Sequence, residues 1–145
     1  MTTAAIFYAA ASLVPSIRTE ELKDLSNAIH DAAIAEDIDP YLLLALAFRE
    51  STLNRKAINH KTGCKGLFQI APIHTKTIMS SLIFSASWSV KTGARILRKA
   101  YDEIGTWEGA LCKFNGRKSR KCSWGRAVIS LAEKIKSQAL KSPGR

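Results

Sequence analysis

Apolar residues recur at intervals of three and four along most of the chain, the spacing typical of amphipathic helices. Over residues 19–37 they are Leu22, Leu25, Ile29, Ala32 and Ala33. Similar patterns predict helices over residues 4–14, 73–83, 87–104, 107–114 and 124–140. Strict alternation of apolar and polar residues, which is typical of strands, hardly occurs. We therefore predict a mostly α-helical protein.

One further helix differs from these because it is apolar on nearly every side. Asp39 suits a helix N-cap, Pro40 suits the first helical position, and residues 41–48 follow with almost no polar side chain. We expect this helix to be central and buried. After it, residues 51–72 lose the periodicity, and polar residues with two glycines indicate a long ordered loop or small hairpin lobe. Long ordered loops are often functional, so this lobe is a candidate site.

The 145 residues suit a single domain, with an N-terminal helical extension over residues 1–17 and a basic C-terminal part over residues 112–145. Residues 4–14 have the length of a signal-peptide core, but no Lys or Arg precedes them. We expect no cleaved signal peptide, and instead a helix that packs on the body. Its apolar face comprises Ile6, Ala10, Leu13 and Val14.

The net charge of +10 is concentrated near the C-terminus. Residues 112–145 contain ten basic residues and only Glu133, so they carry +9 and leave +1 for residues 1–111. This argues against a uniformly basic nucleic-acid coat protein and for a near-neutral body with one positive surface. Two rivals stay open. The cations of residues 113–121 with Trp124 resemble a single-strand binding surface, and the last helix could act on membranes. That helix has an apolar face of Ala127, Val128, Leu131, Ile135 and Leu140.

Three cysteines leave two alternatives. Cys112 and Cys122 flank a short basic loop and could close it as a disulfide, with Cys64 free, or all three could stay reduced. His60 precedes Cys64 by four residues, but no paired Cys-x-x-Cys motif accompanies them. We expect no metal site, and we interpret the cysteines mainly as small apolar packing residues.

Glu50 is the candidate for chemistry because it lies at the end of the buried helix. The residues on its own helix face are apolar: Leu43, Leu46 and Ala47. Apolar surroundings and the negative end of the helix dipole both disfavour a carboxylate, so we expect a raised pKa. An acid that stays protonated near neutral pH can donate a proton to a glycosidic oxygen. The plain alternative is a structural carboxylate paired with Arg49 or Arg55.

The residues after Glu50 form a recognisable pattern. Glu50-Ser51-x-x-Asn54-x-x-Ala57, followed by Gly63-x-x-Gly66-Leu67-Phe68-Gln69-Ile70-x-Pro72, resembles the signature of the soluble lytic transglycosylases, relatives of goose-type lysozyme. Gly93-Ala94-x-Ile96-Leu97 and Ala110-Leu111-x-x-Phe114-Asn115 follow in the family's order. The resemblance covers roughly residues 20–130 and implies a lysozyme-like domain with Glu50 as the single catalytic acid and base.

The resemblance also implies a set of substrate-binding residues: Ser51, Phe68, Gln69, Ile70, Phe114 and Asn115. Ser51 would help hold Glu50, Phe68, Gln69 and Ile70 would line the saccharide groove, and Asn115 would contact the substrate N-acetyl group or the surroundings of Glu50. Each has a plainer alternative, as a helix cap, a core residue or a partner for loop backbone. This chain departs from the family at Phe114, where a Tyr is usual, and at Arg117, where a Gly is usual.

The distribution of carboxylates favours one type of reaction. Residues 51–101 contain no Asp or Glu, so the loop lobe offers no second carboxylate for two-carboxylate hydrolysis. We therefore favour cleavage of the MurNAc–GlcNAc β-1,4 bond by Glu50 alone, with formation of 1,6-anhydromuramyl ends. Lysozyme-type hydrolysis of the same bond stays open, with Asp102, Glu103, Glu108 or Glu133 as its second carboxylate.

The resemblance implies peptidoglycan glycan strands as the partner and no metal, nucleotide or redox cofactor. We expect a monomer that binds the anionic cell envelope through residues 112–145 and has no specific nucleic-acid partner. The short chain favours a bacteriophage endolysin or virion-associated lysin that is made in the host cytoplasm and acts on the cell wall. A bacterial enzyme is the alternative.

Overall fold

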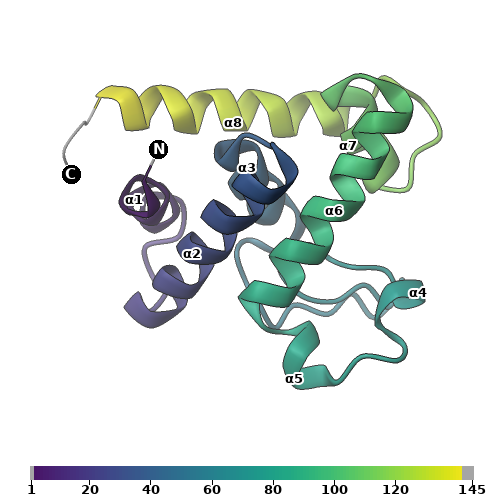
Figure 1. Ribbon diagram of the computed structural model, residues 1–145, viewed down its shortest axis with the longest axis horizontal. Coiled ribbons are helices and arrows are strands. Elements are labelled where there is room, and N and C mark those ends of the chain that lie inside the picture. The colour runs from purple at the N-terminus through teal and green to yellow at the C-terminus, as the bar shows by residue number, and fades with distance from the viewer. Residues whose placement is uncertain (1, 142–145) are drawn as a thin grey trace.

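The computed structural model describes residues 2–141, and helices dominate it (Figure 1). The helices in this part of the chain are α1 (Thr3–Leu13), α2 (Thr19–Glu36), α3 (Pro40–Ser51), α4 (Pro72–Thr75), α5 (Ser80–Ile83), α6 (Ala86–Ile104), α7 (Trp107–Phe114) and α8 (Ser123–Lys141). The predicted mostly α-helical class is therefore confirmed.

Helix α3 is the buried centre of the molecule, as its sequence predicts. Every residue from Tyr41 to Ala47 is buried. Asp39 caps the helix, because its Oδ1 accepts a hydrogen bond of 2.8 Å from the Tyr41 N–H. Helices α1, α2 and α8 pack on α3, and Figure 1 shows α8 lying across it. The end of α3, which carries Glu50, is thus fixed by the surrounding helices.

The terminal helices use their apolar faces to cover this centre. Ile6 and Ala10 of α1 are fully buried, and Val128 and Ile135 of α8 are buried against the core. Trp124 is partly buried and packs on the core. Much of the apolar face of α8 is therefore used in packing, although Leu140 at its end is exposed. No helix within residues 2–141 is both long enough and apolar enough to cross a bilayer.

The predicted loop lobe lies between α3 and α6 and contains little regular structure. Isolated bridges pair Lys65 with Ile58 and with Ile70. The single helix predicted over residues 73–83 is wrong, because two separate turns, α4 and α5, form there. Ile73, Met79 and Leu82 are exposed, so most apolar residues of this segment have no packing partner that would stabilise a continuous helix.

The lobe is attached to α6 through a close approach of backbone and aromatic ring. A Cβ on Gly93 would lie 1.9 Å from Cδ2 of Phe68, so only glycine fits beneath this ring. The Phe68 N–H donates to Oγ of Ser89, also on α6, at 3.3 Å. These contacts fix the segment that leads into Gln69.

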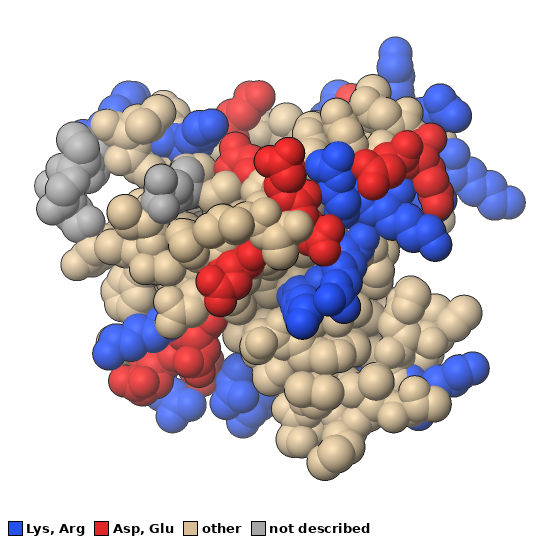
Figure 2. Space-filling model, viewed as in Figure 1, with Lys and Arg blue, Asp and Glu red and all other residues tan. Residues whose placement is uncertain are grey.

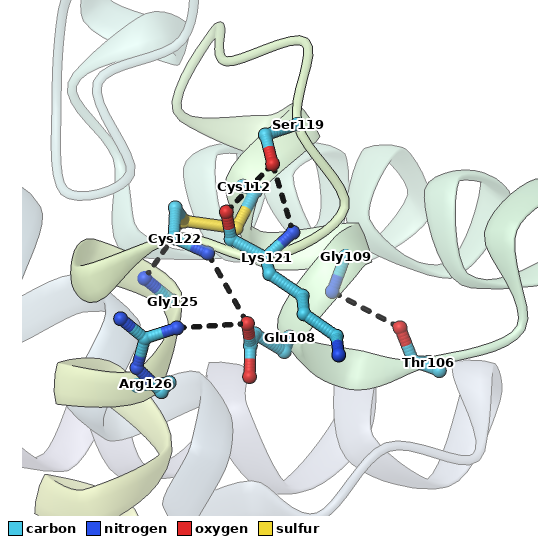
Figure 3. Close-up of polar contacts among 9 residues, drawn as sticks. All are labelled: Thr106, Glu108, Gly109, Cys112, Ser119, Lys121, Cys122, Gly125 and Arg126. Atoms are coloured by element: carbon cyan, nitrogen blue, oxygen red, sulfur yellow. Dashed lines mark hydrogen bonds and ion pairs between the residues drawn. A yellow bond between two sulfur atoms is a disulfide. The ribbon is translucent and has the colours of Figure 1, made fainter.

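A disulfide joins α7 to the start of α8 (Figure 3). Cys112 and Cys122 are bonded, with a Cα–Cα distance of 6.0 Å, and Cys64 is free. Oε2 of Glu108 accepts a hydrogen bond of 3.1 Å from the Cys122 N–H and lies 3.3 Å from Nη1 of Arg126. The disulfide alternative therefore holds, and the loop of residues 113–121 is closed at both ends.

The charge is arranged differently from the near-neutral body that the sequence suggested. Residues 1–50 contain three basic and eight acidic residues, whereas residues 51–101 contain nine basic and no acidic residues. The small net charge of residues 1–111 thus combines an acidic region, residues 1–50, with a basic region, residues 51–101. Figure 2 shows Lys and Arg gathered over α6, α7 and the loop that follows.

Candidate active site

A cleft of about 690 Å³ opens where the loop lobe meets the end of α3 and the last turns of α6 and α7. Five residues that the sequence singled out line it: Glu50, Gln69, Ile70, Phe114 and Asn115. They come from three separate segments of the chain. The fold therefore brings most of the predicted site together.

Glu50 occupies the last turn of α3 and is half-buried in the wall of this cleft. Leu43, Leu46 and Ala47, which share its helix face, are fully buried. Burial raises the pKa of Glu50 from its usual range to about 7, and a hydrogen bond with the Asn115 side chain acts in the opposite direction. The direction expected from the sequence is confirmed.

A structural ion pair does not account for Glu50. Within residues 2–141, no Lys or Arg forms an ion pair with it. Arg55, one of the two suggested partners, lies 3.8 Å from Glu21 and lines a second cavity of about 340 Å³ beside α2. A pKa raised by burial and not lowered by a cation leaves Glu50 able to donate a proton near neutral pH.

The backbone turns sharply directly after Glu50. Thr52 and Leu53 both have positive φ, 54° and 60°, which is uncommon for residues other than glycine. Leu53 is buried and anchors the turn. Two such residues in succession beside a candidate acid fit the tendency of strained backbone to occur at functional sites.

Ser51 does not hold Glu50 in the way that the resemblance implied. Its Oγ donates a 3.0 Å hydrogen bond to the Ala47 carbonyl of the preceding helical turn. The side chain therefore satisfies the C-terminal end of α3, the plainer alternative.

The segment from Phe68 to Ile70 divides between cleft and core. Gln69 faces the cleft, has a φ of +51°, and donates from Nε2 to the carbonyls of Ala57 (3.2 Å) and Gly66 (3.0 Å). Ile70 is buried and forms part of the cleft floor.

Phe68 is a correction, because it is fully buried and is not among the residues that line the cleft. Its ring fills the space above Gly93 and meets the Phe114 ring edge-on, with 6.4 Å between centroids. It therefore supports the cleft from below and does not face a saccharide.

Asn115 directly follows α7 and lines the same cleft as Glu50. Its Oδ1 accepts a hydrogen bond of 3.1 Å from Nε of Arg117, and its side chain also bonds Glu50. Phe114, half-buried beside it, contributes an apolar wall. The hydroxyl of the Tyr usual in the resembling family has no counterpart on this ring.

Sequence reasoning missed a charged pair in the cleft. Glu103, in the last turn of α6, pairs with Lys113 of α7. The hydrogen bond from Lys113 and its charge lower the pKa of Glu103, so this group stays a carboxylate. Nothing local marks Glu103 among the downstream acids, because its partner is ten residues away across a helix corner. Lys99 and His74 also line the cleft.

The described residues contain no group of three or more His, Cys, Asp or Glu side chains arranged as metal ligands.

Comparison with known families gives a match between residues 27–136 and a family described as Transglycosylase SLT domain. Comparisons with curated proteins and with solved structures gave no match.

Proposed function

The chain belongs to the SLT transglycosylase family and is therefore a peptidoglycan lytic transglycosylase, and from this premise we propose that Glu50 is the single acid and base of its reaction. The observation that supports this most is the position of Glu50. It is half-buried in the wall of the cleft, with a pKa raised to about 7 by burial. A group with this pKa is populated in both protonation states near neutral pH.

In the first half of the proposed reaction, protonated Glu50 donates its proton to the oxygen of the MurNAc–GlcNAc β-1,4 bond. The carbon–oxygen bond at C1 of the muramyl sugar breaks, and the GlcNAc hydroxyl departs. The carbonyl oxygen of the sugar's own N-acetyl group bonds to C1 in its place. Glu50 is left as a carboxylate, which Asn115 stabilises by hydrogen bonding.

In the second half, the Glu50 carboxylate accepts the proton of the muramyl C6 hydroxyl. The C6 oxygen attacks C1, the bond from C1 to the N-acetyl oxygen breaks, and a 1,6-anhydro ring closes. Glu50 returns to its protonated form. One carboxyl group thus performs both proton transfers, and no water is consumed.

The other cleft residues suit glycan binding. Gln69 and Asn115 offer polar groups to the N-acetyl and hydroxyl groups of a sugar, while Ile70 and Phe114 offer apolar surface to its ring faces. We assign these four residues to substrate binding. Gln69 also holds the lobe through its two bonds to backbone carbonyls.

Hydrolysis is the second candidate reaction, because Glu103 is a second carboxylate in the same cleft. The ion pair with Lys113 accounts for the Glu103 carboxylate without giving it a catalytic role. A Glu103→Gln variant discriminates the two routes. If Glu103 activated water, this variant would lose activity, whereas in the proposed reaction it keeps forming anhydromuramyl products.

Product analysis tests the proposal directly. Purified peptidoglycan is digested and its fragments are measured by mass spectrometry. Anhydromuramyl ends support the proposed reaction, and reducing ends alone would replace it with hydrolysis. In parallel, Glu50→Gln should lower the rate by about 10²- to 10⁴-fold, the usual contribution of a general acid. A folded Glu50→Gln protein with full activity would refute the assignment of Glu50.

A further inference from the structure

Arg117 reaches the cleft only through another residue. Its Nε donates to Oδ1 of Asn115 at 3.1 Å, and Asn115 lines the cleft together with Glu50. We propose that Arg117 is a positioning residue for Glu50, which orients the Asn115 amide so that its N–H groups point at the Glu50 carboxyl group. The proposal rests on the assignment of Glu50 as the catalytic acid and adds to it the residue that sets its orientation.

The two ends of the Asn115 amide differ in what they can bond. An asparagine side chain carries an acceptor oxygen and a donor nitrogen, and rotation about its last bond exchanges them. An N–H of Arg117 can bond only the oxygen, since arginine has no acceptor. Once Oδ1 is occupied by Arg117, Nδ2 is the end left to face Glu50. A carboxylate accepts from such a donor, whereas the reverse orientation would set two oxygens against each other.

Arg117 is exposed, but its backbone is held in place. The Arg117 N–H donates to the Cys112 carbonyl at 2.9 Å, the Gly116 N–H to the Lys113 carbonyl at 2.9 Å, and the Asn115 N–H to the Leu111 carbonyl at 3.0 Å. The Cys112–Cys122 disulfide closes the same loop (Figure 3). The short path from Cys112 to Arg117 thus presents Asn115 in one orientation.

The consequence concerns the ionised form of Glu50. A donated hydrogen bond favours the carboxylate and works against burial, which favours the acid. The other titratable groups that line the cleft are the free thiol of Cys64 in the loop lobe, His74 of α4, Lys99 and Glu103 of α6, and Lys113 of α7. None of these is altered when Arg117 is replaced, so a change in the Glu50 pKa reports on the Arg117–Asn115 contact.

The test measures the pKa of Glu50 itself, by carbon NMR of the labelled side-chain carboxyl in the free protein. We expect Arg117→Ala to raise this pKa by at least about 0.5, because the amide loses its fixed orientation. Lys118→Ala is the matched control, since it removes an equal charge from the same loop. Among the described residues, the Lys118 side chain has no hydrogen bond or ion pair. It should leave the pKa of Glu50 within about 0.1.

A double substitution separates positioning from simple charge. In an Asn115→Ala background, Arg117→Ala should no longer change the pKa of Glu50. The proposal is overturned if Arg117→Ala has no effect alone, or if its effect is as large without Asn115 as with it. Because the titration does not measure catalysis, it decides the role of Arg117 even if Glu50→Gln were to show that Glu50 is not the catalytic acid. If Glu50 is confirmed as the catalytic acid, the basic limb of the pH–activity profile of Arg117→Ala should shift to higher pH together with the pKa of Glu50.

Discussion

At the scale of single residues, the protonation of Glu50 determines the pH range of the proposed reaction. The acid form is needed for the first proton transfer, and the pKa is about 7 because of burial. We therefore expect kcat/KM on soluble peptidoglycan fragments to be highest on the acidic side of neutrality and to fall about tenfold per pH unit well above pH 7. A profile that stays flat to pH 9 would contradict this role.

The same protonation also affects stability. The pKa of Glu50 is higher in the folded than in the unfolded protein, so the folded state binds the extra proton between about pH 4.5 and 7. Stability is therefore highest below the unfolded pKa and is lost as the pH rises through the folded pKa. Glu50→Gln removes the buried carboxylate. The substitution changes the free energy of unfolding, and we expect this change to be more stabilising at pH 8 than at pH 4 by about 1–3 kcal/mol.

Denaturant unfolding at the two pH values measures this difference. Glu133→Gln serves as the matched control, because Glu133 is exposed on α8. Its substitution should change stability equally little at both pH values. An equal effect of Glu50→Gln at pH 4 and pH 8 would show that burial does not raise the pKa of Glu50.

At the scale of elements, the contact between the loop lobe and α6 depends on Gly93. A Cβ at this position would lie 1.9 Å from Cδ2 and 2.7 Å from Cγ of Phe68. Because the ring is fully buried, it cannot move into solvent. We expect Gly93→Ala to lower the free energy of unfolding by about 2–3 kcal/mol and to lower activity, since Gln69 and Ile70 follow Phe68. Urea unfolding and wall-lysis rates measure the two effects.

A second substitution tests the cause. Phe68→Leu removes ring atoms from the overlap, so the double variant should lose less stability than the two single losses added together. Additive losses would place the cost of Gly93→Ala elsewhere than at the Phe68 ring.

The disulfide is the second element-scale feature. It closes the loop that contains Asn115, which lines the cleft, and Arg117, which bonds Asn115. Replacement of Cys112 and Cys122 by Ala should cost about 2–4 kcal/mol of stability and lower activity more than Cys64→Ala. Reductant should lower the thermal midpoint of the wild type but not of the double variant. Equal midpoints with and without reductant would show that the bond contributes no stability.

The sequence predicts the long helices well because each buries a continuous apolar face. Asp39, expected as a cap, accepts a backbone hydrogen bond at the start of α3. The prediction over residues 73–83 was wrong because periodicity does not tell whether a partner surface exists. Phe68 was misplaced for a related reason, since the glycine that makes room for it lies 25 positions away, at Gly93. The sequence does not distinguish Glu103 from the other downstream acids, because only the packing of α6 against α7 brings it near Lys113.

At the scale of the whole molecule, the distribution of charge affects how the enzyme associates with peptidoglycan. Two regions in which basic residues far outnumber acidic ones meet near the cleft. Residues 51–101 supply the lobe and most of α6, and residues 112–145 supply the loop after α7 and α8. Most acidic residues lie in residues 1–50, away from the lobe in sequence. An anionic polymer would thus be attracted toward the cleft side, which a net charge alone does not predict.

This attraction predicts a specific salt dependence. Lysis of intact walls should slow as ionic strength rises above 0.15 M, where the Debye length is about 8 Å, because the cations near the cleft then no longer act over distance. Cleavage of short glycan fragments whose muramyl carboxyl groups are capped as neutral amides should change little over the same range, since these fragments carry no charge to attract. Lys118→Glu with Lys121→Glu should flatten the dependence on walls and leave the fragment rate as it was. If salt slowed walls and neutral fragments equally, the ions would be acting on the cleft itself, and the basic regions would have no part in substrate capture.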